Sequence, residues 1–254
     1  MLNKESLFIP FSILLVFSTT QLALVSRMVA FLHIQKADIG SYYVCESINT
    51  NSSSANSSAN ASTTGQYEDE SLNFDLYVLP EKLSVNQGHT TNGAAGYGLV
   101  LSIAFSAGTF VLRNNLYYRH HKVILRSMTI ALGLLVLFTF SAFIYVFAVT
   151  YLTLGNEIDI QVARNLAGKP YNIDSWTPET WYQALLALPL YKADLSSAYQ
   201  EMLTWRWWIL PYLFVCLMAF VWTAIVYVKE RDLPMNFMRY WTGKADVDRK
   251  SSPV

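Results

Sequence analysis

The chain has 254 residues, of which 53% are apolar and only 14% are charged, whereas roughly 25% are charged in a typical soluble domain. Its formal net charge of zero argues against a nucleic-acid partner, because proteins that bind nucleic acid usually present a basic face. Two cysteines are too few for a small secreted domain held together by disulfides. The composition therefore indicates an integral membrane protein.

Four segments are long and apolar enough to cross a bilayer, whose hydrocarbon core of about 30 Å needs about 20 helical residues. They are residues 6–26, 93–112, 127–154 and 207–228. We therefore expect an all-α membrane protein with a four-transmembrane-helix bundle. The third segment is uncharged throughout, and at about 1.5 Å per residue it is long enough to project past the headgroups.

The first segment has a second interpretation as a cleaved signal peptide, because Lys4 precedes an apolar stretch. Cleavage requires small residues, and Ser26 is small whereas Leu24 is not. The apolar character also resumes after Arg27, over residues 28–34. A retained helix over residues 6–26 is the favoured interpretation, with an extension to residue 34 as an open alternative, and the topology of the remaining chain is the same in all cases.

The distribution of basic residues predicts the orientation, because short loops rich in Lys and Arg stay in the cytosol. The connection 113–126 contains four such residues and no acidic one, and the tail 229–254 contains six. The two long loops, residues 36–92 and 155–204, are acidic overall. We expect residues 1–5, a basic hairpin over 113–126 and the tail to be cytosolic, with both long loops outside.

The first outer loop contains three acceptor sequences for N-glycosylation, which begin at Asn51, Asn56 and Asn60. They fall in residues 49–66, a low-complexity polar segment that we expect to be disordered. Such a composition also produces acceptor sequences by chance. Their position in a loop predicted to lie outside favours the interpretation as a glycoprotein.

Both outer loops contain short elements of predicted structure. Residues 41–48, 72–78 and 158–162 have the composition or the alternation of strands, which predicts a small extracellular or luminal β-sheet of three strands. In the second loop, Thr177, Pro178 and Glu179 resemble an N-cap, a first helical position and an acidic first turn. This pattern predicts a short helix over 178–188.

The layout resembles the claudin and fungal SUR7/PalI type of tetraspan. It shares with them four spans, a long first outer loop with strands, a shorter second outer loop and cytosolic ends. The resemblance implies a tetraspan fold and concerns the layout alone. The paired cysteines that mark the first loop of those families are absent, since Cys45 is the single cysteine of this loop.

Candidate functional residues are few. The span interiors contain no charged residue, which argues against an ion pump, a proton-coupled transporter or a voltage sensor. No motif for catalysis, a cofactor or a metal is found. Cys45 is a candidate for an intermolecular disulfide, with burial as the alternative. Four small residues have the spacing of a partner-helix face, with packing inside the bundle as the alternative; they are Ala94, Gly98, Ala104 and Gly108.

These features favour a non-enzymatic tetraspan, a membrane-organising, adaptor or accessory protein that contacts the lipid bilayer and other membrane proteins. We expect it in the plasma membrane or a membrane of the secretory pathway. The alternative is a small membrane enzyme, or an accessory subunit of one, that acts on a lipid or apolar substrate through residues at the span ends; these are Glu201, Arg206, Tyr212 and His120. Glu201 and Arg206 are near enough in sequence to suggest an ion pair. The uncharged spans disfavour a transporter or channel component.

Overall fold

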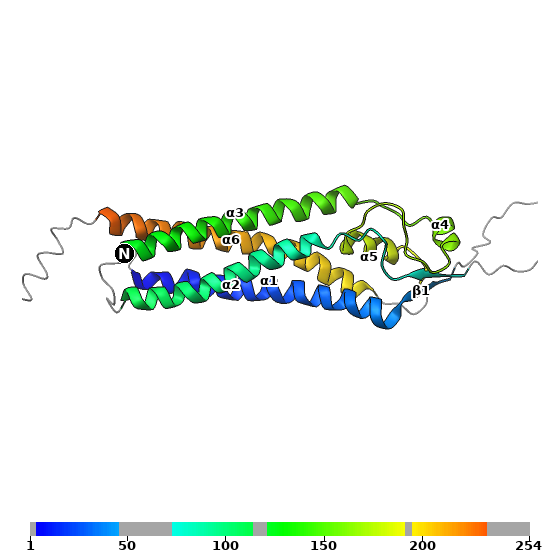
Figure 1. Cartoon of the computed structure of the whole chain (residues 1–254), viewed down its shortest axis with the longest axis horizontal. Helices are drawn as coiled ribbons and strands as arrows, with labels where there is room; N and C mark the ends of the chain where they lie inside the picture. The colour runs from blue at the N-terminus through cyan, green and yellow to red at the C-terminus, as the bar shows by residue number, and fades with distance from the viewer. Residues whose placement is uncertain (1–3, 46–72, 114–120, 191–194, 233–254) are drawn as a thin grey trace, which may run out of the picture. The chain divides into compact units, whose positions relative to one another are not determined.

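The computed structural model describes residues 4–45, 73–113, 121–190 and 195–232 (Figure 1). This part of the chain is mostly helical, with four long helices, shorter helices and a two-stranded sheet. The elements in chain order are a 3₁₀ turn (Lys4–Leu7), α1 (Phe8–Ile34), a π-helical turn (Gln35–Ile39), β1 (Ser41–Val44), β2 (Phe74–Tyr77), α2 (Asn86–Arg113), α3 (His121–Thr153), α4 (Ile160–Asn165), α5 (Pro178–Leu186) and α6 (Ser196–Asp232).

Four helices in the described part are long and apolar enough to cross a membrane. They are α1 with its following turn (Phe8–Ile39), α2, α3 and α6 as far as Glu230. The shortest has 28 residues, or about 42 Å of helix at 1.5 Å per residue, against a hydrocarbon core of about 30 Å. Each helix covers all but one or two residues of an apolar segment predicted from the sequence, or the whole segment, and these lengths support a multi-pass membrane protein.

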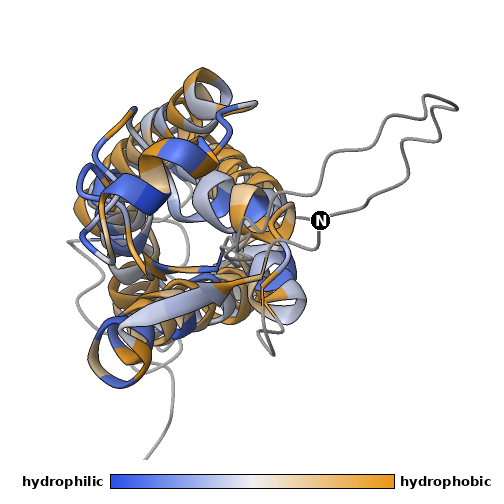
Figure 2. Ribbon diagram, turned by 90° about the vertical axis from the view of Figure 1, so that its right-hand side faces the viewer, coloured by the Kyte–Doolittle hydropathy of each residue, from blue (hydrophilic) through white to orange (hydrophobic). Residues whose placement is uncertain are grey.

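The chain divides into two compact units. Unit 1 contains residues 1–23, 90–144 and 207–254, and its core comes from all four long helices. On α3 the buried side chains recur every three or four residues, at Leu125, Met128, Leu132 and Leu135, which is the spacing of closely packed helices. Many large apolar side chains point outward instead, such as Leu137 at 66% exposure. Figure 2 shows this apolar character along the long helices, as expected for helices that contact lipid.

Unit 2 contains residues 24–89 and 145–206. Its sheet pairs β1 with β2 in antiparallel register, with Ser41 opposite Tyr77 and Val44 opposite Phe74. Alternate side chains of both strands are buried in the unit's core. An isolated antiparallel bridge also pairs Val44, the last residue of β1, with Leu190. The first two predicted strands are therefore present, over shorter ranges than expected.

The third predicted strand, residues 158–162, is wrong. Residues 160–165 form helix α4, and the described sheet has two strands. The cause is local, because the Asp159 carboxylate accepts hydrogen bonds from the backbone N–H groups of Gln161 and Val162 and so caps a helix. Ile158 and Ala163 are both buried, and a short apolar alternation does not distinguish the two structures.

Helix α5 lies within the range predicted for it. The Thr177 side chain accepts from the Thr180 backbone N–H, the Thr180 side chain accepts from that of Thr177, and Pro178 occupies the first turn. The helix ends at Leu186, three residues before Pro189. Several other predictions fall outside the described residues, among them the predicted disorder of segment 49–66, His120 with the other hairpin residues of 114–120, and the tail beyond residue 232.

Candidate functional site

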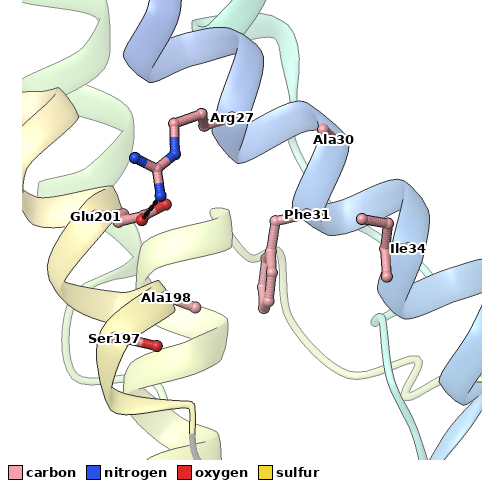
Figure 3. Close-up of a pocket in the computed structure, with 7 residues that line it drawn as sticks. All are labelled: Arg27, Ala30, Phe31, Ile34, Ser197, Ala198 and Glu201. Atoms are coloured by element: carbon pink, nitrogen blue, oxygen red, sulfur yellow. Dashed lines mark hydrogen bonds and ion pairs between the residues drawn. The ribbon is translucent and has the colours of Figure 1, made fainter.

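The most distinct site in unit 2 is an open groove between α1 and α6, with a volume of about 330 Å³ (Figure 3). It is lined by Arg27, Ala30, Phe31, Ile34, Ser197, Ala198 and Glu201. The lining is mostly apolar, and the charged atoms gather at one end, where Arg27 Nη2 donates to Glu201 Oε1. Both charged side chains are accessible, with exposures of 69% and 40%.

The groove follows from helical spacing and side-chain size. On α1 the lining residues are three or four positions apart and therefore share one face of the helix. Ala30 and Ala198 are too small to fill the space between the two helices. The Phe31 ring extends from α1 into this space (Figure 3), and its centroid lies 5.3 Å from that of Tyr182. The result is an apolar surface with a polar end.

The ion pair at the groove contributes little to folding. Exposed pairs of this kind are worth about 0–1 kcal/mol, because water solvates both charges when they separate. The contact between Arg27 and Glu201 can therefore open, and each side chain can bind a charged group of a ligand instead, at a small cost in free energy. The pairing suggested from the sequence, Glu201 with Arg206, is wrong, since Glu201 contacts Arg27 and Arg206 contacts Glu179. Residues five apart point in different directions on a helix.

The second ion pair of unit 2 is buried. Arg206 Nη1 lies 2.9 Å from Glu179 Oε1, and the two side chains are 15% and 3% exposed. The Arg206 guanidinium also lies 5.6 Å from the centre of the Phe147 ring. Burial raises the pKa of Glu179, and the positive charge of Arg206 opposes that rise. This pair links α5 to α6, and such pairs serve geometry more than stability.

Two buried tyrosines of unit 2, Tyr42 and Tyr182, are poorly suited to act as bases. Tyr42 Oη donates to Gln35 Oε1 at 2.5 Å. Burial raises the pKa of Tyr42 to about 12, and it also raises the pKa of Tyr182 beside it. Both phenols therefore keep their protons at neutral pH. A general base must be deprotonated before it can accept a proton from a substrate.

Unit 1 contains a buried polar layer that sequence reasoning missed. Tyr212 Oη donates to the Ala94 carbonyl at 2.9 Å, and the Tyr212 and Ser18 oxygens converge on the surface of Gly98. Thr139 is fully buried as well. A Cβ placed on Gly98 would lie only 2.2 Å from Tyr212 Oη and 2.7 Å from Ser18 Oγ. The sequence does contain a signal for this layer, namely Ser, Thr and Tyr residues inside the apolar segments. Such residues are also common in membrane spans, so they did not indicate a buried polar layer.

The structure separates the four residues of the predicted partner-helix face. Ala94 and Gly98 pack inside unit 1, against neighbours within the chain. Ala104 is exposed, and Gly108 is half-buried with the Met128 sulfur 3.7 Å from its added Cβ position. The group that approaches Gly98 closely is therefore Tyr212 of the same chain, while Ala104 faces outward.

The remaining predicted residues are isolated from the groove. Cys45 is partly exposed, Cys216 is buried, and both are free thiols. Asn51, Asn56 and Asn60 lie outside the described residues. Among the residues that the structure describes, no group of three or more His, Cys, Asp or Glu side chains could hold a metal ion.

Comparison with known proteins gives no family model that matches the chain, and no curated protein or solved structure that is significantly similar to it. The function must therefore be argued from the residues themselves.

Proposed function

We propose that this chain is a non-enzymatic, four-span accessory protein that holds another integral membrane protein through its outer surface. Both ends are cytosolic in this proposal, and the two long loops, which supply most of unit 2, face the outside or a lumen. The support for this orientation is the basic connection 113–126 and the acidic outer loops. The loop asparagines Asn51, Asn56 and Asn60 then carry glycans, and their triple substitution abolishes a glycosidase-sensitive shift in gel mobility.

The observation that carries the proposal is the α3 apolar end, which consists of Tyr151 and Leu152 in the last turn of α3 and of Leu154 just after the helix. These side chains are 78%, 81% and 51% exposed. Arg126 marks the inner end of the apolar segment, and about 20 residues from there complete a 30 Å core. Residues 147–154 then extend about 12 Å further. Apolar side chains that are exposed outside the hydrocarbon core mark a surface for a protein partner.

The partner most compatible with this surface is another integral membrane protein. A protein confined to the same bilayer presents its own juxtamembrane residues at the level of the α3 apolar end. The surface is too small for a stable contact with a freely diffusing protein, which commonly buries about 800 Å² on each side. Shared confinement raises the effective concentration of the partner and makes a small contact sufficient.

A photo-crosslinking amino acid at position 152 tests the proposal, with position 137 as the matched control. Leu137 is also strongly exposed, but it lies near the middle of the span, where lipid is the expected neighbour. We expect a protein adduct of discrete mass from position 152 and none from position 137. Mass spectrometry then identifies the partner. Equal adducts at the two positions, or none at 152, would refute the proposed docking surface.

A second candidate function is a protein that acts on a lipid or apolar substrate, and the groove between α1 and α6 favours a lipid-binding version of it. Arg27 and Glu201 are the only charged residues that line this groove. They provide a guanidinium and a carboxylate that can bind the charged groups of a polar head. Release of a cleaved product from defined lipid vesicles by the purified chain would favour an enzyme over an accessory protein.

A further inference from the structure

We propose that the groove between α1 and α6 binds the headgroup of a zwitterionic phospholipid from the outer leaflet. Arg27 would bind the phosphate, Glu201 would bind the ammonium, and Phe31 with Ile34 would contact the apolar part of the lipid. This site is separate from the α3 apolar end and does not depend on a protein partner.

The first argument is the position of the charged pair along the helices. Arg27 directly follows the apolar segment 6–26, and Glu201 precedes the apolar segment 207–228 by less than two turns. Trp207, which is 53% exposed, is the first residue of this second segment. Tryptophan and arginine at the end of a span mark the level of the lipid headgroups.

The second argument is charge complementarity. A guanidinium binds phosphate through two parallel hydrogen bonds, and a carboxylate is the natural partner of an ammonium group. The exposed ion pair between Arg27 and Glu201 is cheap to open. A zwitterionic headgroup replaces both partners at once, whereas an anionic lipid leaves Glu201 without a cation.

The third argument is the apolar lining. Figure 3 shows the Phe31 ring in the space between the helices, on the same side as the ion pair. A quaternary ammonium binds well against an aromatic face next to a carboxylate. The volume of about 330 Å³ falls at the lower end of small-ligand sites, which suits a headgroup better than a protein helix. Choline is therefore the headgroup that this lining fits best.

Native mass spectrometry of the full-length chain in mild detergent tests the proposal. The probes are phosphatidylcholine, phosphatidylglycerol and water-soluble phosphocholine, each added separately. We expect one bound phosphatidylcholine per chain and at least about tenfold weaker retention of phosphatidylglycerol. Phosphatidylglycerol lacks the quaternary ammonium, and loss of a cation–π contact with an aromatic ring has an effect of this size. Phosphocholine alone should bind far more weakly than the lipid, because it lacks the apolar contacts.

Three variants separate the binding groups. Arg27→Gln should weaken both lipids, while Glu201→Gln should weaken phosphatidylcholine and reduce its preference over phosphatidylglycerol. Ala30→Trp keeps both charges and should reduce binding by filling the groove. Glu157→Gln, an exposed acidic position outside the groove, is the matched control and should leave retention unchanged. Thermal melting of each variant checks that the fold is retained.

Several outcomes would overturn the proposal. Equal retention of the two lipids, unchanged by Arg27→Gln and Glu201→Gln, would mean that lipid binds without this site. Equal binding of phosphocholine and phosphatidylcholine would identify a soluble ligand instead of a membrane lipid. A discrete protein adduct from a photo-crosslinker at position 30 would assign the groove to a protein partner.

Discussion

Gly98→Ala should destabilise unit 1 through steric clashes of the added methyl group. The added Cβ would lie 2.2 Å from Tyr212 Oη and 2.7 Å from Ser18 Oγ, both closer than real Cβ contacts allow. The Tyr212 hydroxyl is the end of a rigid ring, so the ring must move as a whole. That movement breaks its hydrogen bond to the Ala94 carbonyl.

The magnitude has two parts. Overpacking a close-packed site costs about 1–3 kcal/mol. A hydrogen bond between membrane helices contributes about 1 kcal/mol, and it is lost when Tyr212 is displaced. Alanine favours a helix over glycine by up to about 1 kcal/mol, which offsets part of the loss. We therefore expect a net decrease of about 1–3 kcal/mol in the free energy of unfolding.

Gly96→Ala is the matched control, because Gly96 is on the same helix and its added Cβ meets nothing within 4 Å. Denaturation in detergent, followed by circular dichroism, gives the free energy of unfolding for each variant. Gly96→Ala should equal or exceed the wild type. Adding Tyr212→Phe to Gly98→Ala should recover part of the loss, since the nearest ring carbon would then lie 3.3 Å away. Equal stability of the two alanine variants would refute the reasoning.

Three further predictions concern unit 2, each measured by unfolding in detergent. Thr177→Ala removes the N-cap of α5 and should cost about 1 kcal/mol, whereas Thr204→Ala, at an exposed mid-helix hydroxyl, should have little effect; equal losses would contradict the capping role. Trp181→Phe leaves the Val78 carbonyl without its 2.8 Å donor and should cost about 1–3 kcal/mol; an unchanged stability would show that the bond is dispensable. Burial raises the pKa of Glu179 above its ordinary value of 4.5, so protonation of Glu179 stabilises the fold below pH 4.5, and this contribution is lost as pH rises through the pKa of the folded state. Glu179→Gln should flatten the dependence of the free energy of unfolding on pH. An unchanged pH profile would rule out Glu179 as the source of that dependence.

Local features made much of the fold predictable. The length of an apolar run is a property of adjacent residues, so the four long helices could be found without any tertiary information. The same is true of α5, whose cap and first turn are contiguous at Thr177 and Pro178. The alternation over 158–162 was ambiguous, because a short apolar alternation is compatible with both a strand and a helix. Its outcome was decided by one capping carboxylate, that of Asp159.

The sites depend on contacts that sequence patterns do not encode. Arg27 and Glu201 are 174 positions apart, so only the packing of α1 against α6 within unit 2 brings them together. The spacing of Ala94 and Gly98 correctly indicated close approach, but it could not identify Tyr212 as the group that approaches. Pairing Glu201 with Arg206 failed because nearness in sequence was taken for nearness on the helix surface.

In the proposed topology, four helices cross the membrane and leave both outer loops on one side. Labelling of intact cells with a membrane-impermeant maleimide tests this topology, using single cysteines at Cys45, at Glu157→Cys and at Lys229→Cys, with Cys216→Ala in all three proteins and Cys45→Ser in the last two. Two spans separate positions 45 and 157, and three separate 45 and 229. We predict labelling from outside at 45 and 157, and labelling at 229 only after permeabilisation. Labelling of 229 in intact cells, or opposite accessibility of 45 and 157, would contradict the four-span topology.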